Sequence, residues 1–163
     1  MSTHITRDEI YNSVAPSDFP AMLDVNRYGK RTDAFDKIIS STQDHFWDPL
    51  DEAYIDFNTP FDMENEMIMP RETIPELQSA VADKLDEGQL IKLANESVRW
   101  GVSGILHGEQ GALSLSASLC HILLDPGAQE YATNQTREEA RHVTAFSRYI
   151  QVRWGSPYPV GQA

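Results

Sequence analysis

Apolar residues recur at helical spacing through most of the second half of the chain. Two long stretches without proline carry this pattern, one from about Gln89 to Leu124 and one from Ala128 to about Trp154. The turn sequence Asp125-Pro126-Gly127 separates them, and Gly155 and Pro157 follow the second. Glycine and proline at such positions are typical of helix boundaries. The pattern therefore predicts a long antiparallel helical hairpin.

Four glycines interrupt the first long stretch, at positions 101, 104, 108 and 111. Each destabilises an exposed helix interior by up to ~1 kcal/mol. Small residues also let a helix lie close to its neighbours. We therefore expect this helix to pack tightly on several sides.

A shorter helical stripe precedes the hairpin. Thr73, followed three residues later by Glu76, matches a helix start signal. Apolar residues from Leu77 to Leu85 continue at helical spacing, and Gly88 marks a break. We expect a further helix in this region.

The N-terminal part of the chain has a less regular pattern. Prolines recur throughout residues 1–69, with one amphipathic stretch from Asp33 to Ser41. The segment from Phe46 to Phe57 is acidic and too aromatic for a disordered tail. No alternating strand pattern of convincing length is present. We therefore expect a single all-α domain, in which an irregular segment (1–69) packs on a helical region (70–163).

The composition restricts the class of function. The chain has 163 residues, with 13 Lys and Arg against 25 Asp and Glu, a formal charge of −12. This acidic balance argues against nucleic-acid binding, which needs a basic surface. The longest unbroken apolar run is three residues, as in Ile122–Leu124, far below the ~20 residues that a membrane span needs, and the first residues lack a signal-peptide pattern. Since there is one cysteine, a disulfide framework is excluded. We expect a cytoplasmic protein that does not enter a membrane.

Three residues with metal-binding side chains lie on the apolar faces of the two long helices. Glu109 is in the middle of the first face, and Glu139 and His142 are in the middle of the second. Glu139 and His142 are three residues apart, so both point to the same side of their helix.

An antiparallel hairpin brings these residues to similar heights. Glu109 lies about 22 Å before the turn and Glu139 about 18 Å after it, at 1.5 Å per residue. Buried ionised groups are costly unless they are paired or bind a metal. Two carboxylates and an imidazole suit iron or manganese. The alternative is a solvated pair of Glu139 and His142, with Glu109 paired to Arg141 or Arg148.

These residues also resemble a known family. Glu109, followed thirty residues later by Glu139-Ala-Arg-His142, resembles the first half of the ferritin-like di-iron carboxylate proteins. The sequence Glu138-Glu-Ala-Arg-His-Val143 is most similar to the hydroxylase large subunits of bacterial multicomponent monooxygenases and related di-iron oxidases. The resemblance covers about residues 87–155.

The resemblance implies a ligand set and a ferritin-like four-helix bundle, of which the hairpin is half. Glu109, Glu139 and His142 would ligate one iron of a di-iron centre, with Glu139 bridging to the second. Glu138 matches a position that in the family hydrogen-bonds a ligand histidine of the other half. An exposed helix carboxylate is the alternative for Glu138.

The chain departs from the family because it contains half of the ligand set. A complete centre needs a second Glu and a second Glu-x-x-His, and no other histidine of the chain (His4, His45, His107, His121) has Glu three residues before it. Either the chain is a fragment or two copies form a homodimer that completes the bundle. The expected function is a di-iron oxidase or oxygenase that oxidises an organic substrate, supplied with electrons by a separate reductase. The alternatives are a homodimeric ferroxidase and a metal-free helical interaction module.

Overall fold

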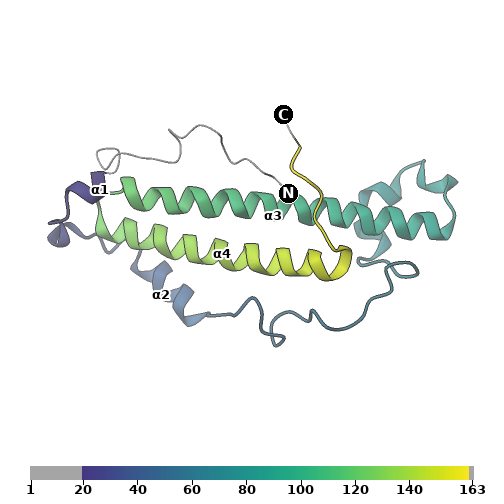
Figure 1. Ribbon diagram of the computed structural model, residues 1–163, viewed down its shortest axis with the longest axis horizontal. Helices are drawn as coiled ribbons and strands as arrows, with labels where there is room; N and C mark the ends of the chain where they lie inside the picture. The colour runs from purple at the N-terminus through teal and green to yellow at the C-terminus, as the bar shows by residue number, and fades with distance from the viewer. Residues whose placement is uncertain (1–19, 162–163) are drawn as a thin grey trace. The chain divides into compact units, whose positions relative to one another are not determined.

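The computed structural model describes residues 20–161, which fold entirely into helices and connecting segments. Two long helices pack antiparallel after an irregular segment (Figure 1). In chain order, with η for 3₁₀ helices, the elements are α1 (Pro20–Leu23), η3 (Tyr28–Lys30), α2 (Asp36–Asp44), η4 (Arg71–Thr73), η5 (Pro75–Gln78), η6 (Ala82–Lys84), α3 (Glu87–Ile122) and α4 (Pro126–Trp154). The predicted all-α fold and helical hairpin are confirmed. That the hairpin is half of a ferritin-like bundle stays a prediction.

A reciprocal pair of hydrogen bonds fixes the start of α3. The backbone N–H of Gln89 donates to Asp86 Oδ1 (2.9 Å), and the Gln89 side chain accepts from the backbone N–H of Asp86 (3.0 Å). This capping box satisfies two amide groups that would otherwise lack partners. The helix therefore begins at Glu87, two residues before the predicted position, and Gly88 lies in its first turn.

The chemistry predicted for the turn and for the end of the hairpin is present. Asp125 Oδ1 accepts a hydrogen bond from the backbone N–H of Ala128 (2.8 Å), and Pro126 is the first residue of α4. An aspartate cap followed by proline is a favoured helix start. After Trp154 the chain turns at Gly155, whose φ of 79° favours glycine.

The chain divides into two compact units, and α3 and α4 run through both. One unit contains residues 20–46 and 114–136 of the described chain, and the other contains residues 47–113 and 137–161. The boundary at 69/70 that the sequence suggested stays a prediction. Each unit is described by itself below.

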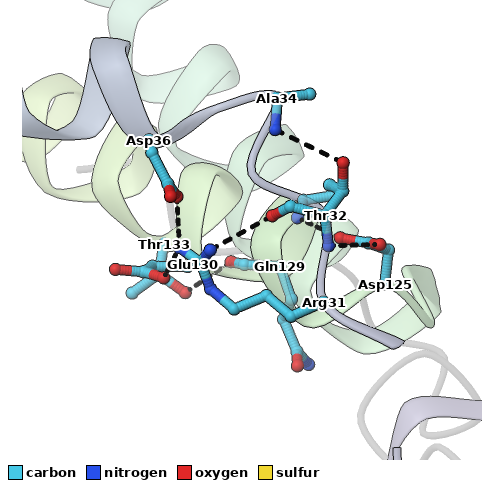
Figure 2. A network of polar contacts seen from close by, with 9 residues as sticks. Arg31, Thr32, Ala34, Asp36, Asp125, Gln129, Glu130 and Thr133 are labelled. Atoms are coloured by element: carbon cyan, nitrogen blue, oxygen red, sulfur yellow. Dashed lines mark hydrogen bonds and ion pairs between the residues drawn. The ribbon is translucent and has the colours of Figure 1, made fainter. Parts of the chain in front are cut away.

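In the first unit, the segment before α2 is tied to the helical turn. Figure 2 shows the backbone N–H of Thr32 donating to Asp125 Oδ2 (3.1 Å), on the same carboxylate that caps α4. Beside it, the Arg31 guanidinium binds Asp36 (2.5 Å) and Glu130 (2.8 Å). The Asp125 side chain, which caps α4, thus also holds the segment before α2.

The second unit has its hydrophobic core at the beginning of α3. Leu90 and Ala94 of the helix pack with apolar residues of the preceding 3₁₀ helices. The buried members of this cluster are Ile74, Leu77, Ala82, Leu90 and Ala94.

The buried side-chain amide of Asn95 joins the beginning of α3 to the segment 63–68. Asn95 Nδ2 donates to the backbone oxygens of Met63 (3.0 Å) and Glu66 (2.9 Å), and its Oδ1 accepts from the backbone N–H of Ile68 (2.9 Å). Asn95 is buried, so these bonds replace water that the side chain has lost. The segment 63–68 is therefore held against α3.

The chain that follows α4 lies along α3 in the same unit. Arg99 binds the backbone oxygen of Ser156 (3.0 Å), and the buried Ser103 accepts from the backbone N–H of Tyr158 (2.9 Å). His107 Nε2 donates to the Tyr158 backbone oxygen (2.8 Å). Because these three α3 residues are spaced by four, they form one row along the helix.

The prediction of an α-helix between Thr73 and Leu85 is wrong. The structure has 3₁₀ turns there, and Ser79 is extended (φ −90°, ψ 154°). The Thr73 hydroxyl donates to the backbone oxygen of Pro70 (2.7 Å) and caps no helix. Apolar residues such as Ile74 and Leu77 are nevertheless buried, because a spacing of three also places them on one side of a 3₁₀ turn.

One face of α3 is open in the structure. A Cβ added at Gly101, Gly104, Gly108 or Gly111 would meet no heavy atom within 4 Å beyond its own part of the helix. The neighbouring Trp100 is 70% exposed. The tight packing expected around these glycines is therefore not provided by the described part of the chain.

Among the residues that the structure describes, none of the helices has the length and hydrophobicity needed to span a bilayer.

Candidate metal centre

The structure brings the three predicted ligands together within the second unit. Glu109 projects from α3, and Glu139 and His142 project from α4. Each offers a ligand atom, and these atoms all lie within 4.8 Å of one another, as a group that could hold a metal ion. Glu139 is buried, and Glu109 and His142 are half-buried. The agreement in height follows from the constant rise of two helices that share one turn.

His142 lies between the two carboxylates. Its Nδ1 is 3.2 Å from Glu109 Oε2 and 3.2 Å from Glu139 Oε2. One side of the imidazole thus faces both acids, as it would in a site where oxygen and nitrogen donors surround one cation.

The two carboxylates are close enough to share a proton. A hydrogen bond with Glu139 is the main reason why the pKa of Glu109 lies above its ordinary value of 4.5, and burial raises the pKa further. Contact with His142 acts in the opposite direction. The raised pKa shows that the folded protein disfavours two negative charges here. A divalent cation would remove this repulsion.

The contacts that shift the pKa of Glu109 are with Glu139 and His142, and no arginine is among them. These contacts differ from the alternative interpretation of the sequence, in which Glu109 pairs with Arg141 or Arg148. Arg141 instead forms an ion pair with Glu138 at 2.6 Å, and both side chains are largely buried. Glu138 is therefore not the exposed helix carboxylate of the alternative interpretation. Its contact with a second histidine ligand stays a prediction.

An apolar pocket that the sequence did not predict adjoins His142. It has a volume of about 310 Å³ and is lined by Trp47, Ile55, Val102, Ala145, Phe146 and Tyr149 beside His142. The Trp47 ring stacks on the imidazole, with ring centroids 6.0 Å apart and planes inclined by 25°. The aromatic character of the segment from Phe46 to Phe57 was the available signal, but it did not indicate which residue contacts the site.

Comparison with protein-family models, curated proteins and solved structures finds no match to this chain.

Proposed function

We propose that this chain provides one half of a di-iron carboxylate centre that uses dioxygen to oxidise an organic substrate. The observation that carries the proposal is the convergence of Glu109, Glu139 and His142, whose ligand atoms lie within 4.8 Å of one another on two helices. One Glu on one helix and Glu-x-x-His on another is half of the ligand set of such centres.

The donor set fits iron or manganese. Carboxylate oxygens and an imidazole nitrogen are ligands that suit both metals. The crowding that raises the pKa of Glu109 also favours a cation, because a cation compensates both carboxylates. In this proposal Glu109, Glu139 and His142 would hold the metal on this chain's side of the centre. The remaining ligands come from a second copy or from a further stretch of polypeptide.

The residues of this chain would have distinct tasks. Glu109, Glu139 and His142 would hold the metal, and the ion pair of Glu138 with Arg141 would help to fix the adjoining turn of α4. When bound, iron would supply the redox chemistry that activates dioxygen. Electrons would come from a separate reductase by analogy with the family.

The apolar pocket supports oxidation of an organic molecule over iron handling. It lies against His142 and has no Asp, Glu, Lys or Arg in its lining. A path for iron ions is expected to carry acidic side chains, whereas an organic substrate needs an apolar surface that excludes water.

Metal analysis of the full chain tests the proposal. After anaerobic loading with Fe(II) and desalting, we expect about one iron per chain, half of a two-metal site. Glu139→Gln should lose most of this iron. Glu130→Gln is the matched control, because Glu130 is an exposed acid on the same helix. Substoichiometric iron in the wild type, or equal iron in Glu139→Gln, contradicts the proposal.

Two further measurements separate the alternatives. Oxidation of a large excess of Fe(II) in air without an organic substrate would favour a ferroxidase. A melting temperature that does not respond to iron or to a chelator would favour a metal-free interaction module, because a bound metal stabilises the folded state.

A further inference from the structure

Trp47 connects the Glu–Glu–His cluster to the apolar pocket. It lies outside the helices, in the segment between α2 and η4, and its ring stacks on His142. The same indole lines the pocket together with residues of α3 and α4, such as Val102 and Phe146. One side chain therefore contacts both a candidate ligand and the space beside it.

The pocket lining indicates the class of molecule that fits. Trp47, Phe146 and Tyr149 supply three aromatic rings, and the lining contains no Asp, Glu, Lys or Arg. A charged ligand would lose its hydration without a compensating partner. Aromatic side chains favour flat apolar molecules through stacked and edge-to-face contacts. The volume of about 310 Å³ suits a small molecule.

We propose that Trp47 is a positioning residue that couples metal binding at His142 to the binding of an uncharged aromatic molecule in the pocket. This inference rests on the proposed function, since it takes His142 as a metal ligand. Groups that contact a ligating histidine fix its ring orientation and tune the affinity for the metal. A molecule that touches both Trp47 and His142 changes that contact. By thermodynamic linkage the metal then changes the affinity for the molecule by the same factor.

Cobalt(II) titration of the full chain tests the positioning role. Co(II) is stable in air, and its visible absorption reports coordination geometry. Trp47→Ala should weaken Co(II) binding about three- to tenfold and alter the spectrum, because the imidazole loses its stacking partner. Trp47→Phe should restore most of the affinity. Trp100→Ala is the control, because Trp100 is exposed on α3, and it should leave both readouts unchanged.

Toluene and benzenesulfonate test the coupling. Toluene should shift the Co(II) affinity and spectrum of the wild type, and Trp47→Ala should lose this response. Benzenesulfonate has the same ring with a charge, and its sulfonate is a weak ligand for Co(II), so it should have no effect. Equal responses to toluene and benzenesulfonate, or a toluene response that persists in Trp47→Ala, would overturn the inference. Ile55→Ala alters the pocket lining but neither ring of the Trp47–His142 stack, so it should reduce the toluene response and leave Co(II) affinity unchanged in the absence of toluene.

The results distinguish this inference from the proposed function. If Co(II) does not bind the wild type, or binds Glu139→Gln equally well, the proposed function fails. If Co(II) binding depends on Glu139 but Trp47→Ala keeps the affinity and spectrum of the wild type, only the role of Trp47 is rejected. Circular dichroism of each variant verifies that it is folded.

Discussion

His142 places its Nδ1 3.2 Å from Glu109 Oε2, although thirty-three positions separate the two residues in the chain. The contact joins α4 to α3, so it exists only when the helices pair. A substitution at either end should therefore affect helix pairing as well as the metal binding that we propose.

The crowded carboxylates predict a pH dependence of stability in the metal-free protein. The pKa of Glu109 is raised in the folded state, mainly by its hydrogen bond with Glu139, whereas in the unfolded chain it is near 4.5. The folded state therefore holds the proton more tightly, and stability falls as pH rises from about 4.5 through the raised pKa. Glu109→Gln should lack this fall.

Urea unfolding at a series of pH values, with a chelator present, measures this effect. The free energy of unfolding of Glu109→Gln should rise relative to that of the wild type as the pH increases through this range. Parallel curves for the two proteins would show that Glu109 does not titrate abnormally.

A substitution at Gly127 should destabilise the helical turn. A Cβ at this position would overlap the backbone oxygen of Thr32. Because this oxygen belongs to the backbone, rotation of a side chain cannot relieve the overlap. We expect Gly127→Ala to lower the free energy of unfolding by about 1–3 kcal/mol. Urea denaturation measures this, with Gly29→Ala as the control, because a Cβ there meets no atom within 4 Å. Equal stability of the two variants would contradict the close approach.

Loss of the Asn95 side chain should release the segment beneath α3. Asn95→Ala leaves the backbone groups of Met63, Glu66 and Ile68 without this partner. The expected loss is about 2–4 kcal/mol, because several buried polar groups lose hydrogen bonds together. Asn65→Ala, at an exposed position, should change stability by less than about 0.5 kcal/mol in the same assay. Limited proteolysis between residues 63 and 68 should accelerate only in Asn95→Ala.

Because one face of α3 is open, replacing a glycine on that face should stabilise the protein, in contrast to Gly127→Ala. Gly104 is exposed, and a Cβ there has free space. Gly104→Ala should stabilise the chain by up to ~1 kcal/mol, since alanine favours a helix. Thermal unfolding measures the change at low protein concentration. A clear loss of stability would instead indicate that another polypeptide lies against this face.

The hairpin and the cluster could be predicted because their causes are local. Asp125 and Pro126 are residue types that favour the start of a helix. The fixed rise per residue of a helix places Glu109 and Glu139 at similar heights above the turn. The stack of Trp47 on His142 has no such local cause. It depends on how a segment without periodicity folds back over α4.

Local pattern also failed where two helix types share a spacing. Ile74 and Leu77 are three residues apart, which fits an α-helix and a 3₁₀ turn equally well. The extended backbone at Ser79 interrupts any continuous α-helix, and the residue types at this position do not predict that conformation. The Asp86–Gln89 cap, by contrast, had a readable signal, because aspartate followed three residues later by glutamine is a capping pair.

The burial of the cluster is uneven, with consequences for chemical reagents. His142 keeps 39% of its side chain exposed, whereas Glu139 keeps 10%. An acylating agent such as diethylpyrocarbonate reaches the imidazole from solvent, while a carbodiimide has little access to the inner carboxylate. The rate of acylation at His142 thus reports whether its outward side is covered, by an ion, by a small molecule or by another polypeptide.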